Sequence, residues 1–144
     1  KPCPAYNEKV PGFDLFGVNY KVPMHHHSVT ARNPWLTELS EKHPYALRVM
    51  IHTETARRKG IKDGDEVWLE STLGGKQKGV ARVTECIHPE VVGIAGVLGG
   101  WASGKGAGRG KGVHYASLLA ITPERIDWVS SASDQCVRLK VTKA

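Results

Sequence analysis

Short apolar runs separated by turn-forming residues dominate residues 49–92, and this pattern restricts the fold more than any other part of the sequence. The apolar run 49–51 is typical of a strand. Thr53 is a suitable helix N-cap, residues 54–59 begin with an acidic side chain and end with basic ones, and Gly60 is a typical C-terminal stop. We therefore expect a strand that leads into a helix of one or two turns.

A hairpin is predicted to follow this helix. The dipeptide at 63–64 is a turn signal, after which Val67 and Leu69 alternate with polar residues as in a half-buried strand. Two glycines at 74–75 can take positive φ and reverse the chain, and residues 80–83 return as the second strand. The order expected for the middle of the chain is strand, helical turn and hairpin.

The flanking segments predict different amounts of regular structure. Residues 91–97 form another apolar run, and residues 135–141 alternate apolar with polar side chains, so the latter segment is expected to close the sheet. Residues 1–20 contain several prolines and glycines and predict an irregular N-terminal extension, followed by a domain of residues 21–144. Residues 37–47 predict a polar connection with room for one helical turn.

Composition excludes several classes of protein. With 144 residues and 40% apolar side chains, the chain suffices for one domain with a real core, and its apolar runs fall short of the roughly 20 residues of a membrane-spanning helix. Cys3, Cys86 and Cys136 are far apart, which argues against a disulfide framework, an iron–sulfur cluster and a zinc site. The net charge of +6 suits nucleic acid, an acidic partner or a phosphate-bearing ligand, and the scattered basic residues do not decide among these three.

Three consecutive histidines make residues 24–36 the most polar part of the sequence, and three interpretations remain open. On a strand, His25 and His27 would share a face, as two metal ligands require, but no third ligand has a diagnostic spacing. In the second interpretation, the histidines are solvated or hydrogen-bonded loop residues without a ligand. The third interpretation is a loop that presents imidazole, hydroxyl and amide groups to an anionic or heterocyclic ligand; its further donors are Ser28, Thr30, Arg32 and Asn33.

Residues 97–112 are strongly glycine-rich and predict a loop. They do not form a phosphate-binding Walker motif, because Gly112 stands where that motif needs Ser or Thr and no helix pattern follows. The segment is either a flexible surface loop or a loop whose small residues let a ligand approach the backbone, with Trp101 as a stacking surface.

Taken in order, these motifs resemble the C-terminal dinucleotide-binding domain of the molybdopterin oxidoreductase (dimethyl sulfoxide reductase) superfamily. The matching elements of the middle segment are Met50-Ile51, Ala56, Gly60-Ile61, Asp63-Gly64-Asp65, Val67-Trp68-Leu69, Gly74-Gly75 and Ile87-His88-Pro89. Upstream, Asn33-Pro34-Trp35-Leu36 is most similar to the polysulfide and thiosulfate reductase branch. Downstream, Gly99-Gly100-Trp101 fits the pattern, whereas His114 replaces an expected Asn.

The resemblance implies a mainly β fold with short helices, namely a six-stranded double-psi β-barrel. It also implies that residues 21–144 bind bis(molybdopterin guanine dinucleotide), with molybdenum or tungsten held by a ligand from another domain. We expect no catalytic and no metal-ligating residue in this chain, which on its own should be inactive. The cofactor contacts expected are His25, His26, His27, Ser28, Thr30, Asn33, Trp101, His114, Ser117 and Gln135.

The function implied is that of a domain of a larger oxidoreductase that acts on a sulfur or oxyanion substrate. Its expected partners are the remaining domains of the same enzyme and an iron–sulfur electron-transfer subunit, without nucleic acid or membrane insertion. The compartment is left open, either cytoplasmic or outside the cytoplasm with a prokaryotic parent enzyme. Two alternatives remain: a stand-alone basic barrel that binds nucleic acid or protein, and a separate small subunit of a molybdenum or tungsten enzyme.

Overall fold

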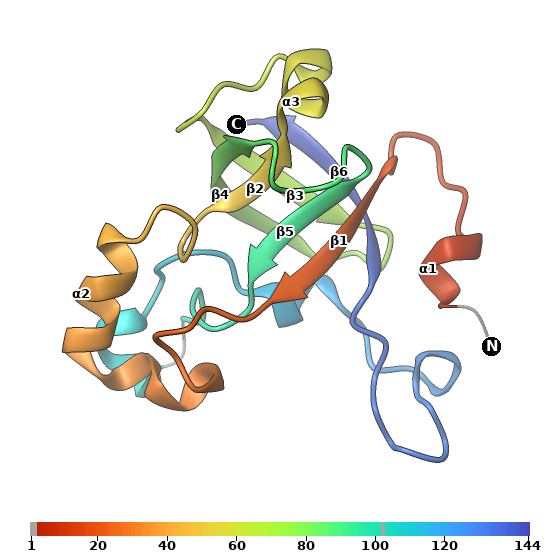
Figure 1. Cartoon of the computed structure of the whole chain (residues 1–144). Coiled ribbons are helices and arrows are strands. Elements are labelled where there is room, and N and C mark those ends of the chain that lie inside the picture. Colours follow the sequence, from red (N-terminus) through yellow and green to blue (C-terminus); the bar gives the residue numbers. More distant parts are fainter. Residues whose placement is uncertain (1–2, 102) are drawn as a thin grey trace.

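Six strands form a closed barrel in the computed structural model, which describes residues 3–101 and 103–144 and only the backbone of residues 103–105. The strands are β1 Leu15–Tyr20, β2 Val49–His52, β3 Glu66–Ser71, β4 Lys76–Thr84, β5 Val91–Ala95 and β6 Val137–Lys143. Around the barrel they follow the order β1-β5-β2-β4-β3-β6 (Figure 1). The pairs β1–β5 and β2–β4 are parallel and the others antiparallel. This mixed barrel confirms the predicted fold class, and parallel pairing between strands distant in sequence agrees with the expected double-psi connections.

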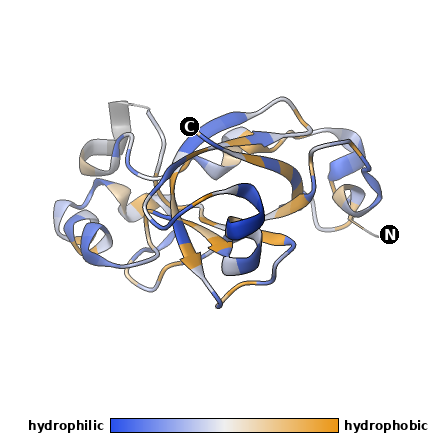
Figure 2. Cartoon of the chain, turned by 90° about the horizontal axis from the view of Figure 1, so that it is seen from above, coloured by the Kyte–Doolittle hydropathy of each residue, from blue (hydrophilic) through white to orange (hydrophobic). Residues whose placement is uncertain are grey.

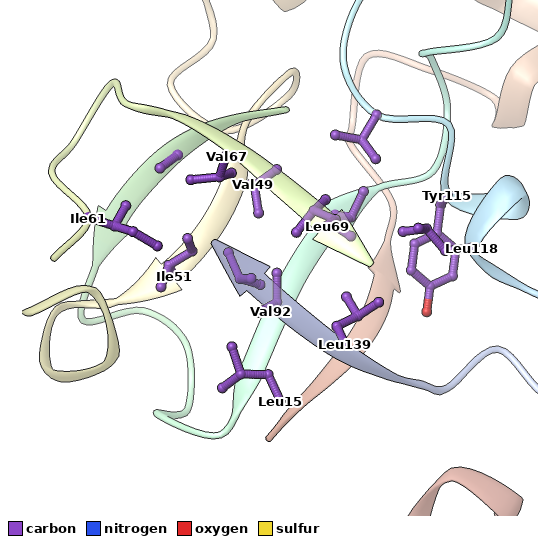
Figure 3. Close-up of a cluster of buried hydrophobic side chains, with 14 of the residues drawn as sticks. Leu15, Val49, Ile51, Ile61, Val67, Leu69, Val92, Tyr115, Leu118 and Leu139 are labelled. Atoms are coloured by element: carbon purple, nitrogen blue, oxygen red, sulfur yellow. The ribbon is translucent and has the colours of Figure 1, made fainter. Parts of the chain in front are cut away.

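Alternating side chains of the strands fill the barrel interior. In β3, for example, Val67 and Leu69 are fully buried while Trp68 between them is partly exposed. Tyr115 extends this core at one end, and its hydroxyl donates to the carbonyl oxygen of Gly17 at 2.9 Å (Figure 3). Full burial of an aliphatic side chain contributes about 1.5–3 kcal/mol. The largest buried side chains include Leu15, Val49, Ile51, Leu69, Ile94, Leu118 and Leu139.

The predicted helix after β2 is present as α3, Thr53–Lys59. Gly60 ends it at φ 66°, in the left-handed conformation that favours glycine, so the predicted stop is confirmed. The prediction that Thr53 caps the helix is wrong, because Thr53 is its first residue. The N-cap is His52, whose Nδ1 accepts a hydrogen bond from the backbone N–H of Glu54 at 3.1 Å.

The N-terminal segment contains more regular structure than predicted. A short helix, α1, covers Pro4–Asn7, and residues 15–20 form barrel strand β1, so the expectation of irregular chain is wrong for these residues. Gly17 explains the tight fit of β1 beside β6, since a Cβ there would lie 2.5 Å from the Leu139 side chain. The barrel therefore starts before residue 21.

A second helix, α2, covers Pro34–Lys42, where only a turn was expected. Asn33 initiates it by accepting hydrogen bonds from the backbone N–H groups of Trp35 and Leu36. Four short 3-10 helices complete the described chain, namely η1 His27–Arg32, η2 Ser103–Gly108, η3 Tyr115–Leu118 and η4 Pro123–Arg125. The strands carry alternating hydrophobic and hydrophilic residues, whereas the helices outside the barrel are mostly hydrophilic (Figure 2). None of the helices in the described part of the chain has both the length and the apolar character to cross a membrane.

Candidate functional site

Two loops leave the barrel side by side because β1 and β5 are parallel neighbours. Tyr20 at the end of β1 is in register with Ala95 at the end of β5, so the histidine-rich and glycine-rich segments begin at the same end of the barrel. There η1 packs against both η2 and α2. We call the surface formed by residues 25–42, 99–101 and 106–112 the loop face; it lies at the end of the barrel opposite α3 (Figure 1).

The two halves of the loop face are packed backbone to backbone. A Cβ at Gly108 would lie 2.7 Å from the carbonyl oxygen of Ala31, so only glycine allows this approach. An ion pair between Lys111 and Glu41 joins the glycine-rich segment to α2. Segments that the sequence predicted as separate loops therefore form one surface.

His25 lies beneath the loop face and is only 8% exposed. Its Nδ1 is 2.9 Å from the Thr30 hydroxyl and its Nε2 is 2.8 Å from the Ser40 hydroxyl. Because the Ser40 hydroxyl donates to the Leu36 carbonyl, its oxygen accepts from His25, which places a proton on Nε2 of the imidazole. Burial lowers the pKa of His25, which favours the neutral form of the imidazole. Both ring nitrogens of His25 are thus engaged in the fold, and a direct contact of His25 with the cofactor stays a prediction.

The buried imidazole predicts a pH dependence of stability. Folding lowers the pKa of His25, so its stabilising effect is complete above the unfolded value of about 6.5 and is lost as the pH falls through the folded value. His25→Gln should lower the free energy of unfolding at pH 8 by about 1–3 kcal/mol, because Gln cannot make both hydrogen bonds. It should also reduce the loss of stability between pH 7 and pH 5, as measured by urea unfolding. The exposed neighbour His26, changed to Gln, is the matched control, and equal effects at both positions would contradict the anchoring role.

The other predicted residues of the histidine-rich segment divide into two groups. His26, His27 and Ser28 are exposed on the loop face, and the two imidazole rings meet edge to face with centroids 5.1 Å apart. Thr30 and Asn33 serve the fold, because Thr30 accepts from the backbone N–H of His26 and Asn33 caps α2. Among the described residues, no group of three or more His, Cys, Asp or Glu side chains is arranged to hold a metal ion.

Trp101 is 70% exposed but its position is fixed by the backbone around it. The ring packs on Gly110, where an added Cβ would lie 2.9 Å from a ring carbon. The Arg109 side chain donates to the Trp101 carbonyl at 3.0 Å, and the Gly110 N–H donates to the Gly100 carbonyl at 3.0 Å. These contacts give an exposed aromatic face that is already held in one orientation. Trp35, by contrast, is 76% exposed on α2.

A cavity of about 280 Å³ opens beside Trp101. Its wall includes Lys78, whose ammonium group lies 2.8 Å from the Glu66 carboxylate. The sequence interpretation missed this part of the site, because it considered only the loops, and the outward-facing positions of β4 carried no motif. The lining residues are Leu47, Glu66, Gln77, Lys78, Gly79, Val80, Trp101, Gly110 and Gly112.

His114, Ser117 and Gln135 lie far from the histidine-rich segment in the sequence. The His114 imidazole hydrogen-bonds to the Ser117 hydroxyl on η3. The Ser117 backbone covers the turn before β4, since a Cβ at Gly75 would lie 2.1 Å from the Ser117 carbonyl oxygen. The Gln135 amide donates to the Ser133 hydroxyl at 2.9 Å. The structure thus pairs His114 with Ser117 and holds Gln135 in a separate loop.

Comparison with known proteins gives one consistent result. A family model described as "Molydopterin dinucleotide binding domain" matches residues 15–134. The thiosulfate reductase molybdopterin-containing subunit PhsA of Salmonella typhimurium (strain LT2) is 38% identical over 106 residues, which are 74% of this chain and 13% of that protein. The chain therefore spans about an eighth of the length of this relative.

A solved structure shows a similar fold at low sequence identity. Acetylene hydratase from Pelobacter acetylenicus superimposes with a TM-score of 0.71 at 16% identity, over 92% of this chain and 18% of the other. At this identity the likeness concerns the fold alone. It covers nearly all of the chain.

Proposed function

The chain belongs to the molybdopterin dinucleotide-binding domain family, and from this premise we propose that its loop face binds one nucleotide end of bis(molybdopterin guanine dinucleotide) within a larger molybdenum or tungsten oxidoreductase. The observation that carries the proposal is the parallel pairing of β1 and β5, which brings the histidine-rich and glycine-rich segments onto one surface. A dinucleotide offers phosphates and a planar base, and this surface offers partners for both.

The donor set of the loop face fits such a ligand. His26, His27 and Ser28 provide exposed donors for phosphate oxygens, and Arg32 adds an exposed guanidinium group on the same segment. Trp101 provides a fixed aromatic face for a base. The cavity beside it, about 280 Å³, is slightly smaller than the roughly 300–1,000 Å³ usual for ligand pockets, so it suits one ring system and not a whole dinucleotide.

The chain's own part in the chemistry is to bind and orient. The bound cofactor supplies two-electron redox chemistry at its metal, for which we propose a sulfur or oxyanion substrate. The protein ligand of that metal would come from another domain of the same enzyme, and an iron–sulfur subunit would exchange the electrons. His25 and Asn33 act indirectly in this proposal, because they fix the loop that carries His26 and His27.

The alternative of a basic module for nucleic acid has little support in the contacts of the basic side chains. Lys111 of the glycine-rich segment pairs with Glu41, and Arg109 bonds to the Trp101 carbonyl; the side chain of Lys105 lies outside the described part of the structure. Many other basic side chains are also in ion pairs with nearby carboxylates. They are Lys42, Arg58, Lys59, Lys76, Lys78, Arg82, Arg125 and Lys143.

Titration of the 144-residue chain with GMP, followed by amide chemical shifts, tests the proposal. We expect shifts in residues 26–33 and 99–112, and weaker binding of CMP if the guanine form is the ligand. Trp101→Ala should weaken GMP binding about 5- to 100-fold, since stacking of a base on an aromatic ring contributes about 1–3 kcal/mol. Trp128→Ala removes an equally exposed ring, 78% against 70%, from another loop and should leave the affinity unchanged. Shifts confined to other surfaces, or equal affinities of both variants and the wild type, would contradict the proposal.

A further inference from the structure

Two of the three cysteines, from opposite ends of the chain, meet beside a buried arginine. Cys3 precedes α1, and Cys136 immediately precedes β6. The Cys3 thiol lies 3.3 and 3.1 Å from the two oxygens of Asp134, whose carboxylate also accepts from the backbone N–H of Cys136 at 3.0 Å. Arg125, only 6% exposed, holds the same carboxylate at 3.4 Å. Both cysteines thus hydrogen-bond to the carboxylate of Asp134.

The shared carboxylate fixes how close the two cysteines come. Cys3 Sγ lies 3.1 Å from one oxygen of Asp134, and the backbone nitrogen of Cys136 lies 3.0 Å from the other. The Cys3 side chain and the backbone at Cys136 therefore contact the same carboxylate group. A disulfide between the two cysteines, with a sulfur–sulfur distance of about 2.0 Å, requires the Cys3 thiol to exchange its contact with Asp134 for one with Cys136.

The surrounding contacts hold Cys3 in this position. Ala5 is fully buried, and its carbonyl accepts from the Arg138 side chain at 3.0 Å. Glu8 pairs with Arg125 and accepts from the Thr72 hydroxyl at 2.7 Å. The segment that carries Cys3 is thus fastened to β6 and to the turn after β3, and its approach to Cys136 is part of the fold.

We propose that Cys3 and Cys136 form a reversible disulfide that fastens the N-terminal segment to the start of β6. Cys3 lines a surface cavity of about 370 Å³, whereas Cys136 is not among the residues that line it, so Cys3 is the first to react. Its thiolate attacks a low-molecular-weight disulfide and releases one thiol, which leaves a mixed disulfide on Cys3. The Cys136 thiolate then attacks the sulfur of Cys3 and releases the second thiol. The two cysteines lose two electrons, the reagent gains them, and the two protons leave on the released thiols.

The environment of the pair predicts a slow reaction that becomes faster at high pH. Burial raises the pKa of Cys3, and the neighbouring Asp134 acts in the same direction. Burial and the negative charge that Cys3 carries when ionised raise the pKa of Cys136 to about 12. Since the thiolate is the reacting form, the rate should rise with pH between pH 7 and pH 9.

Incubation of the full 144-residue chain with oxidised glutathione, followed by tryptic digestion without reduction, tests the proposal. The three cysteines fall in different tryptic peptides, residues 1–9, 83–105 and 126–138. We expect peptide 1–9 joined to peptide 126–138, and a melting temperature that rises by about 5 to 15 °C because the bond closes a very long loop. Dithiothreitol should reverse both changes.

Single substitutions distinguish a specific disulfide between Cys3 and Cys136 from nonspecific oxidation of the cysteines. Cys86 is exposed, and Cys86→Ser should keep both the joined peptides and the rise in melting temperature. Cys3→Ser should abolish both, and it leaves the more buried Cys136 in place. Peptides joined through Cys86, or glutathione adducts on Cys3 and Cys136 that never proceed to a bond between them, would overturn the proposal.

Discussion

Gly99→Ala is expected to lower the free energy of unfolding by about 3–5 kcal/mol, because the substitution combines backbone strain with a steric clash. Gly99 has φ 89°, a conformation that residues with a Cβ rarely adopt. An added Cβ would lie 2.3 Å from both the backbone nitrogen of His114 and the carbonyl carbon of Val113. Backbone atoms cannot rotate away as a flexible side chain can, so the two segments must separate.

Gly64→Ala is the matched control for this substitution. Gly64 has nearly the same φ, 84°, but no atom lies within 4 Å of the position of an added Cβ. Gly64→Ala should lower the free energy of unfolding by only about 1 kcal/mol, and this decrease measures the backbone strain alone. Urea unfolding of both variants gives the comparison. Equal losses at the two positions would show that residues 99 and 113–114 are not packed as the structure has them.

Arg125→Met should destabilise the chain by about 3–5 kcal/mol, because it leaves two partly buried carboxylates without their buried partner. The Arg125 side chain is 5% exposed, and it pairs with Glu8 and Asp134, which are 25% and 17% exposed. Met keeps much of the volume, so the loss reports on charge and hydrogen bonding more than on packing. Arg125→Lys should recover only part of the stability, because an ammonium group cannot bond to both carboxylates in the same geometry.

Lys42→Met provides the comparison on the surface. Lys42 pairs with Glu38 at 2.6 Å, but the two side chains are 72% and 56% exposed. Water solvates both charges, so the loss should stay below about 0.5 kcal/mol. Thermal or urea unfolding at low and high salt distinguishes the two cases, since salt screens the surface pair and hardly affects the buried one. If Arg125→Met lowered the free energy of unfolding no more than Lys42→Met, the result would contradict a stabilising ion-pair network of Arg125 with Glu8 and Asp134.

Local patterns explain why the middle of the fold could be predicted. Each of these patterns involves only a few neighbouring residues, and each correctly predicted the local structure. They are the helix stop at Gly60, the turn at 63–64 and the alternation at Val67 and Leu69. β1 was missed because its order depends on partners that are distant in sequence, β5 and β6. Its Gly17 weakens the strand signal, and only the packing against Leu139 explains the glycine.

The site was harder to predict than the fold. The sequence indicated which segments carry polar groups, and the structure brings two of them together on the loop face. The sequence could not indicate which way each side chain points. His25 was therefore grouped with His26 and His27, although His25 is buried and the other two are exposed. The hydrogen bond from His25 to Ser40, across the start of α2, could not be inferred from spacing. Lys78 was missed because a charged residue facing outward from a strand is usually a solvated one.

The order of strands in the barrel also bears on how the chain folds. β1, near the start of the sequence, completes its hydrogen bonding only when it lies between β5 and β6. The ribosome must therefore synthesise residues up to about 143 before the first strand can find both partners. Pairings between such distant segments make barrel folding slow, of the order of milliseconds to seconds. During that time the hairpin β3–β4 can form by itself, whereas the edge of β1 that pairs with β6 stays without its partner and is exposed to other chains.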